Sequence, residues 1–558
     1  MATDDLDPEA HEWTWRDRAR GSIVRATILD PGTEPVGRVE AFPTAYVPDR
    51  LLVSDGGDAG LGERNLDRVR AAAAVFGWGV VRERLDGAPL GEGETPERRL
   101  PGAPVVTRVR LTTPERAESA SPALPDAWRV LQQVRRTILG EEETGATGSD
   151  ARRGEEGRKG AGAALRAAGV DRIGLDHILT IDPIGVNPFT KTNPFTKTNP
   201  FTKTNPFTKT NPFTKTNPVG EYGDCGSGGR QPVAWVGPEP RRTEPAKGRR
   251  RPVVAVLDTG IGAHAWLPGD LVDRDVRLDG VPVGLHDDAN PEVHPDLYGP
   301  LDGELDPVAG HGTFIAGIVR QLAPDADLLA VRVADALGVV EESNLLKVIE
   351  DLGVLVQRHR DVQGGRAIDV LNLSLGYYHE TPEDGLYTRD LYDLLTILRG
   401  LGTAVVVSAG NDATDRPTFP ASLWAWPGSD NGLGPDDLAP HLSVGALNPD
   451  RRTTALFSNV GPWVRTYAVG AAVLSTLPDF TGGLQASARD DRYDRRRLTI
   501  GPEDYRGGFA VWSGTSFAAP LVAGLIAARL DPPLDGWSVD DAVAAVGDAA
   551  ERALVTLG

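Results

Sequence analysis

The sequence predicts an α/β protein in two parts: a doubly wound, mostly parallel sheet with helices on both faces, preceded by a small α+β ferredoxin-like domain. Two observations lead to this prediction. From residue 252 onward, short apolar segments alternate with helical stretches, as expected for parallel strands buried on both faces. Between residues 46 and 186, strand-like and helix-like segments follow one another in the order β-α-β-β-α-β, the split βαβ pattern.

The N-terminal domain is expected at 46–186, after an N-terminal segment at 1–45 that carries little pattern. Its strands are expected where apolar residues alternate or cluster, at 46–54, 79–85, 105–112 and 177–182. Two helices are expected where apolar residues recur at helical spacing, at 65–78 and 125–139. The Gly-, Arg- and Glu-rich stretch at 140–162 is expected to be a loop.

The C-terminal domain is expected at 252–558. Its apolar strands are expected at 252–258, 327–333, 367–375, 403–410 and 441–447. A Gly-, Pro- and Arg-rich linker at 219–251 precedes it, and the basic run that ends this linker is interpreted as a solvated tether.

Composition narrows the class of protein. The chain has 558 residues, of which 40% are hydrophobic and 25% charged, and a net charge of −20, which disfavours nucleic acid as a partner. The acidic start does not resemble a signal peptide, and no apolar run is long enough to span a membrane. The single cysteine, Cys225, is interpreted as a surface thiol and fits a reducing compartment. The expected location is therefore the cytoplasm, without a membrane partner.

Four motifs place polar residues where chemistry is expected in such a fold. An apolar strand ends on Asp258 in VVAVLDTGIG, and sites of parallel sheets lie at the carboxyl ends of strands. His311 lies between two glycines at the start of a helix, and Asn411 follows a buried strand in SAGN. Ser516 opens a helix whose N–H groups suit a developing oxyanion. Each residue alone also fits an ordinary role in a cap, a turn or the core.

Together, these motifs resemble the subtilisin-like serine proteases (subtilase family, peptidase S8). DTGI, GHGT and GTSFAAP occur in the family's Asp-His-Ser order, and the resemblance covers about residues 251–535. It implies that Ser516 is the nucleophile, His311 the general base and Asp258 the residue that orients the histidine. The Asn411 side chain and the Ser516 backbone N–H would form the oxyanion hole.

The resemblance also implies an extended protein or peptide substrate that pairs with the edge of the sheet. The residues expected to line its groove are Leu373, Ser374, Leu375 and Gly376 on one side and Ser408, Ala409 and Gly410 on the other. Subtilases often bind calcium, which leaves a structural calcium ion open, but no ligand cluster can be assigned to it and no other cofactor is predicted. The sequence does not predict an oligomeric state.

Two insertions depart from the family pattern. One lies in the 53 residues between Asp258 and His311, and the other at about 478–507. Both are expected to leave the triad untouched and to reshape substrate access.

The N-terminal domain resembles the propeptide domain of many subtilases, which assists folding and blocks the groove until it is cleaved. An unrelated α+β adaptor domain is the alternative. Five NPFTKT repeats and a trailing Asn-Pro follow it at 187–218. Asn-Pro favours turns, and one Phe in six residues gives too little apolar surface for independent folding. The tract is interpreted as a tether, and a self-cleavage junction or a multivalent ligand remains open.

The predicted function is a serine endopeptidase that uses an Asp-His-Ser triad and processes itself near the repeats. The competing hypothesis is a binding or scaffold protein with a protease fold, held inactive by its N-terminal half.

Overall fold

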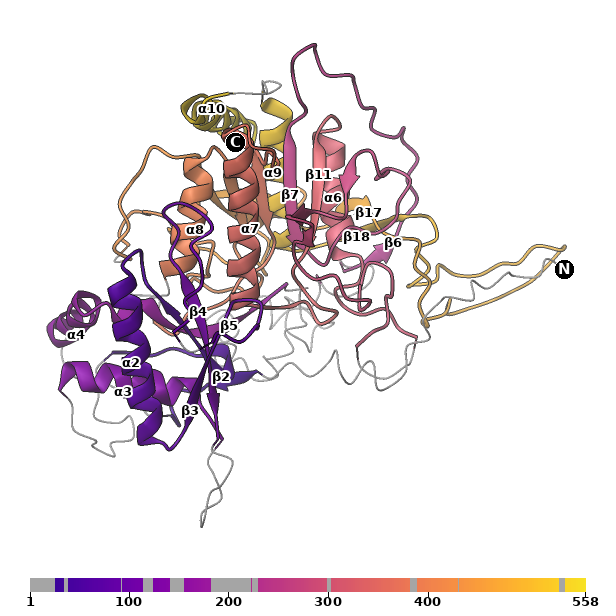
Figure 1. Cartoon of the computed structure of the whole chain (residues 1–558). Coiled ribbons are helices and arrows are strands. Elements are labelled where there is room, and N and C mark those ends of the chain that lie inside the picture. The colour runs from indigo at the N-terminus through magenta and orange to yellow at the C-terminus, as the bar shows by residue number, and fades with distance from the viewer. Residues whose placement is uncertain are drawn as a thin grey trace.

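The computed structural model (Figure 1) describes residues 26–34, 39–91, 93–113, 124–140, 155–181, 222, 229–298, 303–381, 389–429, 431–530 and 537–557. The NPFTKT tract and Cys225 lie outside these residues, so the predictions for them are not tested. Among the described residues, no helix is both long and apolar enough to cross a membrane.

A seven-stranded sheet forms the centre of the C-terminal domain, in the order β16-β15-β14-β13-β7-β11-β8. All of its neighbouring strands pair in parallel. The strands are β7 (Val253–Asp258), β8 (Val272–Asp273), β11 (Asp327–Arg332), β13 (Val370–Leu373), β14 (Ala404–Ser408), β15 (His441–Leu447) and β16 (Thr466–Val469). The predicted parallel α/β fold is confirmed.

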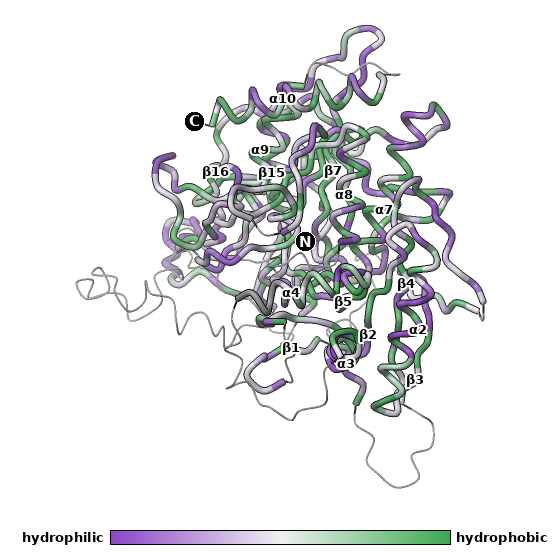
Figure 2. The backbone as a smooth tube through the Cα atoms, turned by 90° about the vertical axis from the view of Figure 1, so that its left-hand side faces the viewer, coloured by the Kyte–Doolittle hydropathy of each residue, from purple (hydrophilic) through white to green (hydrophobic). Residues whose placement is uncertain are grey.

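Helices cover both faces of this sheet. On one face, Val254 and Val256 of β7 pack in the cluster that contains α6 (His311–Leu322), α9 (Thr515–Arg529) and α10 (Val539–Leu557). On the other face, Ala255 and Leu257 pack with α7 (Glu342–Arg360) and α8 (Arg389–Gly400). Because neither face meets water, β7 is apolar throughout until it ends on Asp258. Figure 2 shows these hydrophobic stretches in green along β7, β15 and α9.

The N-terminal domain has the predicted ferredoxin-like topology, with an antiparallel sheet ordered β5-β2-β4-β3. Its elements are β1 (Thr27–Leu29), β2 (Thr44–Ser54), α2 (Ala59–Val75), β3 (Gly79–Glu83), β4 (Val106–Thr112), α3 (Ala127–Leu139), α4 (Glu155–Ala167), the 3-10 turn η1 (Val170–Arg172) and β5 (Ile173–Thr180). The loop expected at 140–162 is partly wrong, because α4 begins within it. Ala161 and Leu165 of α4 are buried in the domain core, and this packing outweighs the polar composition.

The expectation of a solvated tether at the end of the linker is wrong. β6 (Gln231–Pro232) pairs antiparallel with β18 (Phe509–Trp512), and β17 (Val473–Thr476) completes this small sheet. Arg250 donates two hydrogen bonds, each of 2.6 Å, to the carboxylate of Asp369. Asp369 is buried just before β13. Arg250 of the basic run therefore neutralises the buried carboxylate of Asp369, a pairing that the sequence pattern did not indicate.

The two domains join through strand pairing. β12 (Val339–Glu341) pairs antiparallel with β5 and extends the N-terminal sheet by one strand. The first turn of α7, directly after β12, has no side-chain cap of its own. Asp176 of β5 accepts hydrogen bonds there from the backbone N–H and the hydroxyl of Ser343, both at 2.9 Å. The side chain of Asp176, a residue of the N-terminal domain, therefore caps a helix of the C-terminal domain.

Candidate active site

Asp258 is the last residue of β7 and is fully buried. Its Oδ1 accepts hydrogen bonds from the Thr259 N–H at 2.8 Å and from the His311 Nδ1–H at 2.8 Å, and the Thr259 hydroxyl lies 3.0 Å away. Its Oδ2 is buried and has no hydrogen-bond partner among the described residues. The donors to Asp258 therefore converge on a single oxygen.

His311 is the first residue of α6, and the glycines around it are required by close packing. Gly310 has a φ of 80°, a left-handed conformation that glycine adopts readily. A Cβ on Gly312 would lie 1.9 Å from the carbonyl oxygen of Gly260. The backbone at the start of α6 therefore packs directly against the turn after β7, with no room for a side chain on Gly312. This close packing brings His311 to Asp258.

Ser516 lies in the first turn of α9, and this turn packs against His311. The ring of Phe517, the next residue, packs against the His311 ring with centroids 5.1 Å apart, and the Trp512 ring lies 5.5 Å from it. The Ser516 carbonyl accepts a 2.9 Å hydrogen bond from the Ser374 hydroxyl, which ties α9 to the end of β13. The first turn of α9, which carries Ser516, therefore lies against the ring of the histidine that is hydrogen-bonded to Asp258.

Asn411 lies just beyond β14, facing the start of α9. Its Oδ1 accepts from the Thr515 N–H at 2.8 Å and from the Thr515 hydroxyl at 2.9 Å. A backbone N–H can only donate, so these contacts fix which end of the amide is oxygen and direct Nδ2 away from Thr515. The Gly410 N–H donates to the same hydroxyl at 3.0 Å, which holds both segments together.

The predicted substrate groove is bordered by the N-terminal domain. Thr180, the last residue of β5, exchanges backbone hydrogen bonds of 3.0 and 3.1 Å with Gly376, and the Ile181 N–H donates to the Gly338 carbonyl at 2.8 Å. Chain leaving the N-terminal domain therefore runs between two edges of the C-terminal domain, one of them predicted to bind substrate. The sequence carried no signal for Gly338.

The other predicted groove residues are placed as follows. Leu373 ends β13, and Leu375 is buried in the core on the α7 and α8 side of the sheet. Ser408 ends β14, and the carbonyl of Ala409 accepts hydrogen bonds from Thr418 and Asn459 side chains. The Ala409 carbonyl is thus held by the protein itself.

Glu292 is a buried carboxylate at this site that sequence reasoning missed. It accepts hydrogen bonds from Thr259, Gly312 and Thr313, which follow Asp258 and His311 in the chain. A residue from the gap between Asp258 and His311 therefore contacts the segments that carry both residues, without a hydrogen bond to either side chain. Burial, together with the nearby Asp258 charge, raises the pKa of Glu292 to about 7. The 53-residue gap was the only sequence signal.

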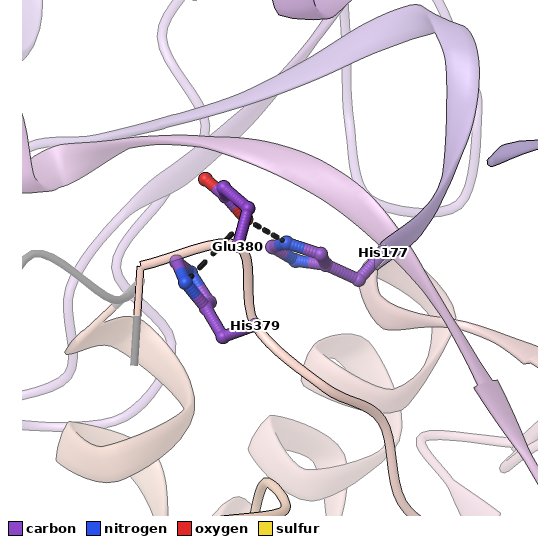
Figure 3. Close-up of side chains that lie close together, drawn as sticks. All are labelled: His177, His379 and Glu380. Carbon is purple, nitrogen blue, oxygen red and sulfur yellow. Dashed lines mark hydrogen bonds and ion pairs between the residues drawn. The ribbon is translucent and has the colours of Figure 1, made fainter. Parts of the chain in front are cut away.

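A second polar cluster lies at the domain interface (Figure 3). His177, His379 and Glu380 are buried, and among the described residues their ligand-type atoms form one group within 4.8 Å. The Thr381 N–H donates to His379 Nδ1 at 3.0 Å and uses the lone pair that a cation would need. The guanidinium of Arg135 lies 3.6 Å from Glu380, which also disfavours a metal. The cluster is a hydrogen-bonded network in which charged His177 and Glu380 lie beside a neutral His379.

Charge complementarity extends across the interface. Several ion pairs join a cation of the N-terminal domain to an anion of the C-terminal domain. The pairs are Arg50–Glu341, Arg99–Asp351, Arg135–Glu380, Arg172–Asp390, Arg172–Asp393, His177–Glu342 and His177–Glu380, together with a long contact between Arg99 and Glu350. Losing the N-terminal domain would remove a cationic partner from the buried carboxylates of Glu342, Glu380 and Asp390.

The structure thus has a buried His–Asp pair at the carboxyl edge of a parallel sheet, packed against the first turn of a helix that carries a serine. The model of the Subtilase family matches residues 249–555, and this chain belongs to the subtilase family.

Curated relatives include an intracellular serine protease of Paenibacillus polymyxa, 27% identical over 286 residues that cover 49% of this chain and 65% of that protein. A thermophilic serine proteinase of Bacillus sp. (strain AK1) is 28% identical over 267 residues, covering 44% of this chain and 51% of that protein. The chain thus spans about half to two thirds of these relatives. A solved structure of a cold-adapted subtilisin-like serine proteinase matches 56% of this chain and 88% of its own, with 21% identity and a TM-score of 0.32.

Proposed function

We propose that this protein is a serine endopeptidase whose catalytic triad is Asp258, His311 and Ser516. The observation that carries the proposal is the 2.8 Å hydrogen bond between His311 Nδ1 and Asp258 Oδ1, made by a histidine that packs against the first turn of α9. With Nδ1 held as a donor, Nε2 carries the lone pair needed to accept a proton. Membership of the subtilase family supports the same assignment.

In the proposed mechanism, Ser516 Oγ attacks the scissile carbonyl carbon as His311 Nε2 takes its proton. The tetrahedral oxyanion accepts hydrogen bonds from Asn411 Nδ2 and the Ser516 N–H at the positive end of α9. His311 then gives its proton to the leaving amine, and Asp258 stabilises the imidazolium throughout. In the second half of the reaction, His311 takes a proton from water, which attacks the acyl-enzyme carbonyl. His311 then returns the proton to Ser516 Oγ as the acid product leaves.

The N-terminal domain is proposed to be an inhibitor that occupies the groove in the manner of substrate. Its support is the pairing of Thr180 with Gly376 and of Ile181 with Gly338, since strand addition is how an extended peptide binds such an edge. The substrate class that fits the same two edges is an extended peptide or an exposed protein segment. Charge pairing across the interface would hold the inhibitor until it is cut or released.

A covalent serine probe separates the peptidase from the scaffold hypothesis. The purified chain is incubated with a fluorophosphonate, which reacts with activated serines, and the labelled residue is found by mass spectrometry. Labelling of Ser516 in the wild type but not in Ser516→Ala supports the peptidase. A folded chain that remains unlabelled even after its N-terminal domain has been cut away would leave the scaffold hypothesis standing.

Self-processing is expected between about residues 183 and 251, where the domain that fills the groove joins the C-terminal domain. Incubation of the purified chain should yield a new N-terminus in this region, identified by Edman sequencing. Ser516→Ala should stay intact under the same conditions. A wild-type chain that cleaves added peptides while remaining whole would reject self-processing without affecting the proposed peptidase.

Asn411→Ala is expected to lower the turnover number by about 10²–10³-fold, the loss seen when one side-chain donor is removed from an oxyanion hole; that magnitude was measured in subtilisin, a member of this family. KM should change little because the donor acts on the transition state. Asn448→Ala, in an exposed turn away from the site, is the control. Equal turnover in both variants would remove Asn411 from the oxyanion hole.

A further inference from the structure

Glu292 lies outside every motif that identifies the family, yet the chain supports it in detail. The side chain is 2% exposed. Arg332, at the end of β11, donates to the carbonyls of Leu285, Asp287 and Ala289 and so anchors the preceding loop. The Asn290 side chain then accepts from the Glu292 N–H at 2.9 Å. Such support places the carboxylate at a defined position within the interior.

The Glu292 carboxylate joins the two segments that carry Asp258 and His311. Its Oε1 accepts from the Thr259 hydroxyl at 2.5 Å and from the Gly312 N–H at 3.0 Å. Its Oε2 accepts from the Thr313 hydroxyl, which in turn accepts from the Gly262 N–H at 2.7 Å. One carboxylate therefore binds the turn after β7 and the first turn of α6 together.

The Thr259 hydroxyl has one proton and two carboxylates within reach. Its oxygen accepts from the Gly312 N–H at 2.9 Å, and it lies 2.5 Å from Glu292 Oε1 and 3.0 Å from Asp258 Oδ1. A hydroxyl donates once, so only one of these oxygens receives its proton at a time. The recipient depends on whether Glu292 is itself protonated.

Two arrangements satisfy every partner. When Glu292 is ionised, Thr259 donates to it across the shorter contact, and Asp258 Oδ1 keeps only the His311 and Thr259 N–H donors. When Glu292 is protonated on Oε1, it donates to the Thr259 oxygen, and the Thr259 proton turns to Asp258. Asp258 Oδ2 has no partner in the described chain. The Thr259 hydroxyl therefore adds a third hydrogen bond to a carboxylate that otherwise receives two, from His311 and from the Thr259 N–H.

The surroundings of Glu292 place the switch between its protonated and ionised forms near neutral pH. Burial and the carboxylate of Asp258 raise its pKa to about 7, while hydrogen bonds from Thr259, Thr313 and Gly312 oppose the rise. The guanidinium of Arg274, which donates to the Ile261 and Gly262 carbonyls, is the nearby cation. Arg332 and the imidazole of His311 are further charged or titratable groups on the elements packed around Glu292.

We propose that Glu292 is a positioning residue of the Asp258–His311 pair, acting through the Thr259 hydroxyl, so that its ionisation strengthens the stabilisation of the His311 cation. An ionised Glu292 withdraws a donor from Asp258, which leaves that carboxylate a better acceptor for the imidazolium, and adds a second negative charge nearby. This inference rests on the proposed peptidase activity.

The variant Glu292→Gln tests it with little change in volume. Its amide nitrogen, placed at Oε1, donates to the Thr259 hydroxyl at every pH, as the protonated carboxyl does, and the Gly312 N–H keeps the Thr259 oxygen as its acceptor. Turnover numbers are measured with a peptide substrate from about pH 5 to about pH 9, each divided by the concentration of serine titrated with a fluorophosphonate. The wild type and the variant should agree below about pH 6. Above about pH 8 the variant should be about tenfold slower, with KM unchanged.

Two controls separate this role from a structural one. Glu503→Gln alters another buried carboxylate, which accepts from the Leu305 and Leu484 N–H groups away from Asp258; its ratio to wild type should not vary with pH. In Thr259→Val, which lacks the relay hydroxyl, adding Glu292→Gln should cause a smaller loss than it does alone. A pH-independent ratio for Glu292→Gln overturns the inference, whereas a wild-type chain without any hydrolysis overturns the proposed function instead.

Discussion

Ser516→Ala is expected to lower the turnover number for peptide hydrolysis by about 10⁶-fold, a magnitude carried over from subtilisin itself. The covalent route is lost with the hydroxyl, and the oxyanion hole and substrate binding provide the small rate that remains. KM should change little, because the hydroxyl contributes to bond formation rather than to holding the peptide. Hydrolysis of a chromogenic peptide by titrated enzyme measures the effect.

The fold should survive this change. Ser516 contributes its backbone carbonyl, not its hydroxyl, to the hydrogen bond from Ser374, so the variant should melt close to the wild-type temperature. Ser487→Ala, which changes an exposed serine whose hydroxyl lies 3.1 Å from that of Thr499, is the matched control and should keep full activity. Hydrolysis by Ser516→Ala at more than a few per cent of the wild-type rate would contradict the assignment of the nucleophile.

His177→Gln is expected to loosen the N-terminal domain and to remove most of the pH dependence of its docking. His177 Nδ1 lies 2.6 Å from Glu342 and Nε2 lies 2.8 Å from Glu380, and all three side chains are buried. Burial alone lowers the pKa of His177, but the charges of Glu342 and Glu380 outweigh it and raise the pKa to about 10. A docked His177 is therefore a cation between two anions.

The sign of the pH effect follows from linkage. The pKa of a solvated histidine is about 6.5, so the docked domain binds the proton more tightly than the released one. The stabilisation is complete below pH ~6.5 and is lost by about tenfold per unit as pH rises toward 10. Burial lowers the pKa of His379 to about 3, so that this neighbour stays neutral throughout, and burial raises the pKa of Asp176 to about 6, just below the window. Docking should weaken in alkaline solution.

Hydrogen exchange of the Ser516→Ala chain measures docking without self-cleavage. The amides of Thr180 and Gly376 bond across the interface, and their protection factors, corrected for intrinsic exchange, should fall above pH ~6.5. His177→Gln should lower protection at pH ~6 by about 10²–10⁴-fold, because breaking a buried ion pair costs about 3–5 kcal/mol. The control His286→Gln should keep the wild-type profile. Protection independent of pH in the His177-containing chain would reject this role.

Much of the fold could be predicted because it depends on local pattern. The unbroken apolar run of β7 predicts a strand buried on both faces, and its final Asp258 marks the carboxyl edge where sites form. The split βαβ order at 46–186 could be predicted for the same reason, because each helix and strand has its own hydrophobic periodicity. Predictions from composition were wrong where tertiary contacts decided the structure. The polar stretch predicted to be a loop contains the start of α4, and Arg250, predicted to be solvated, pairs with a buried aspartate.

The sequence by itself determined the chemistry of the motifs, because Asp258, His311, Asn411 and Ser516 each lie in short segments whose residue types reflect local needs. Only the tertiary structure decided what surrounds them. Glu292 reaches Thr259 across 33 positions, and His177 meets Glu380 across 203. Neither contact leaves a periodic or composition signal, since a buried carboxylate acquires its partners, and hence its pKa, only when distant segments pack against it.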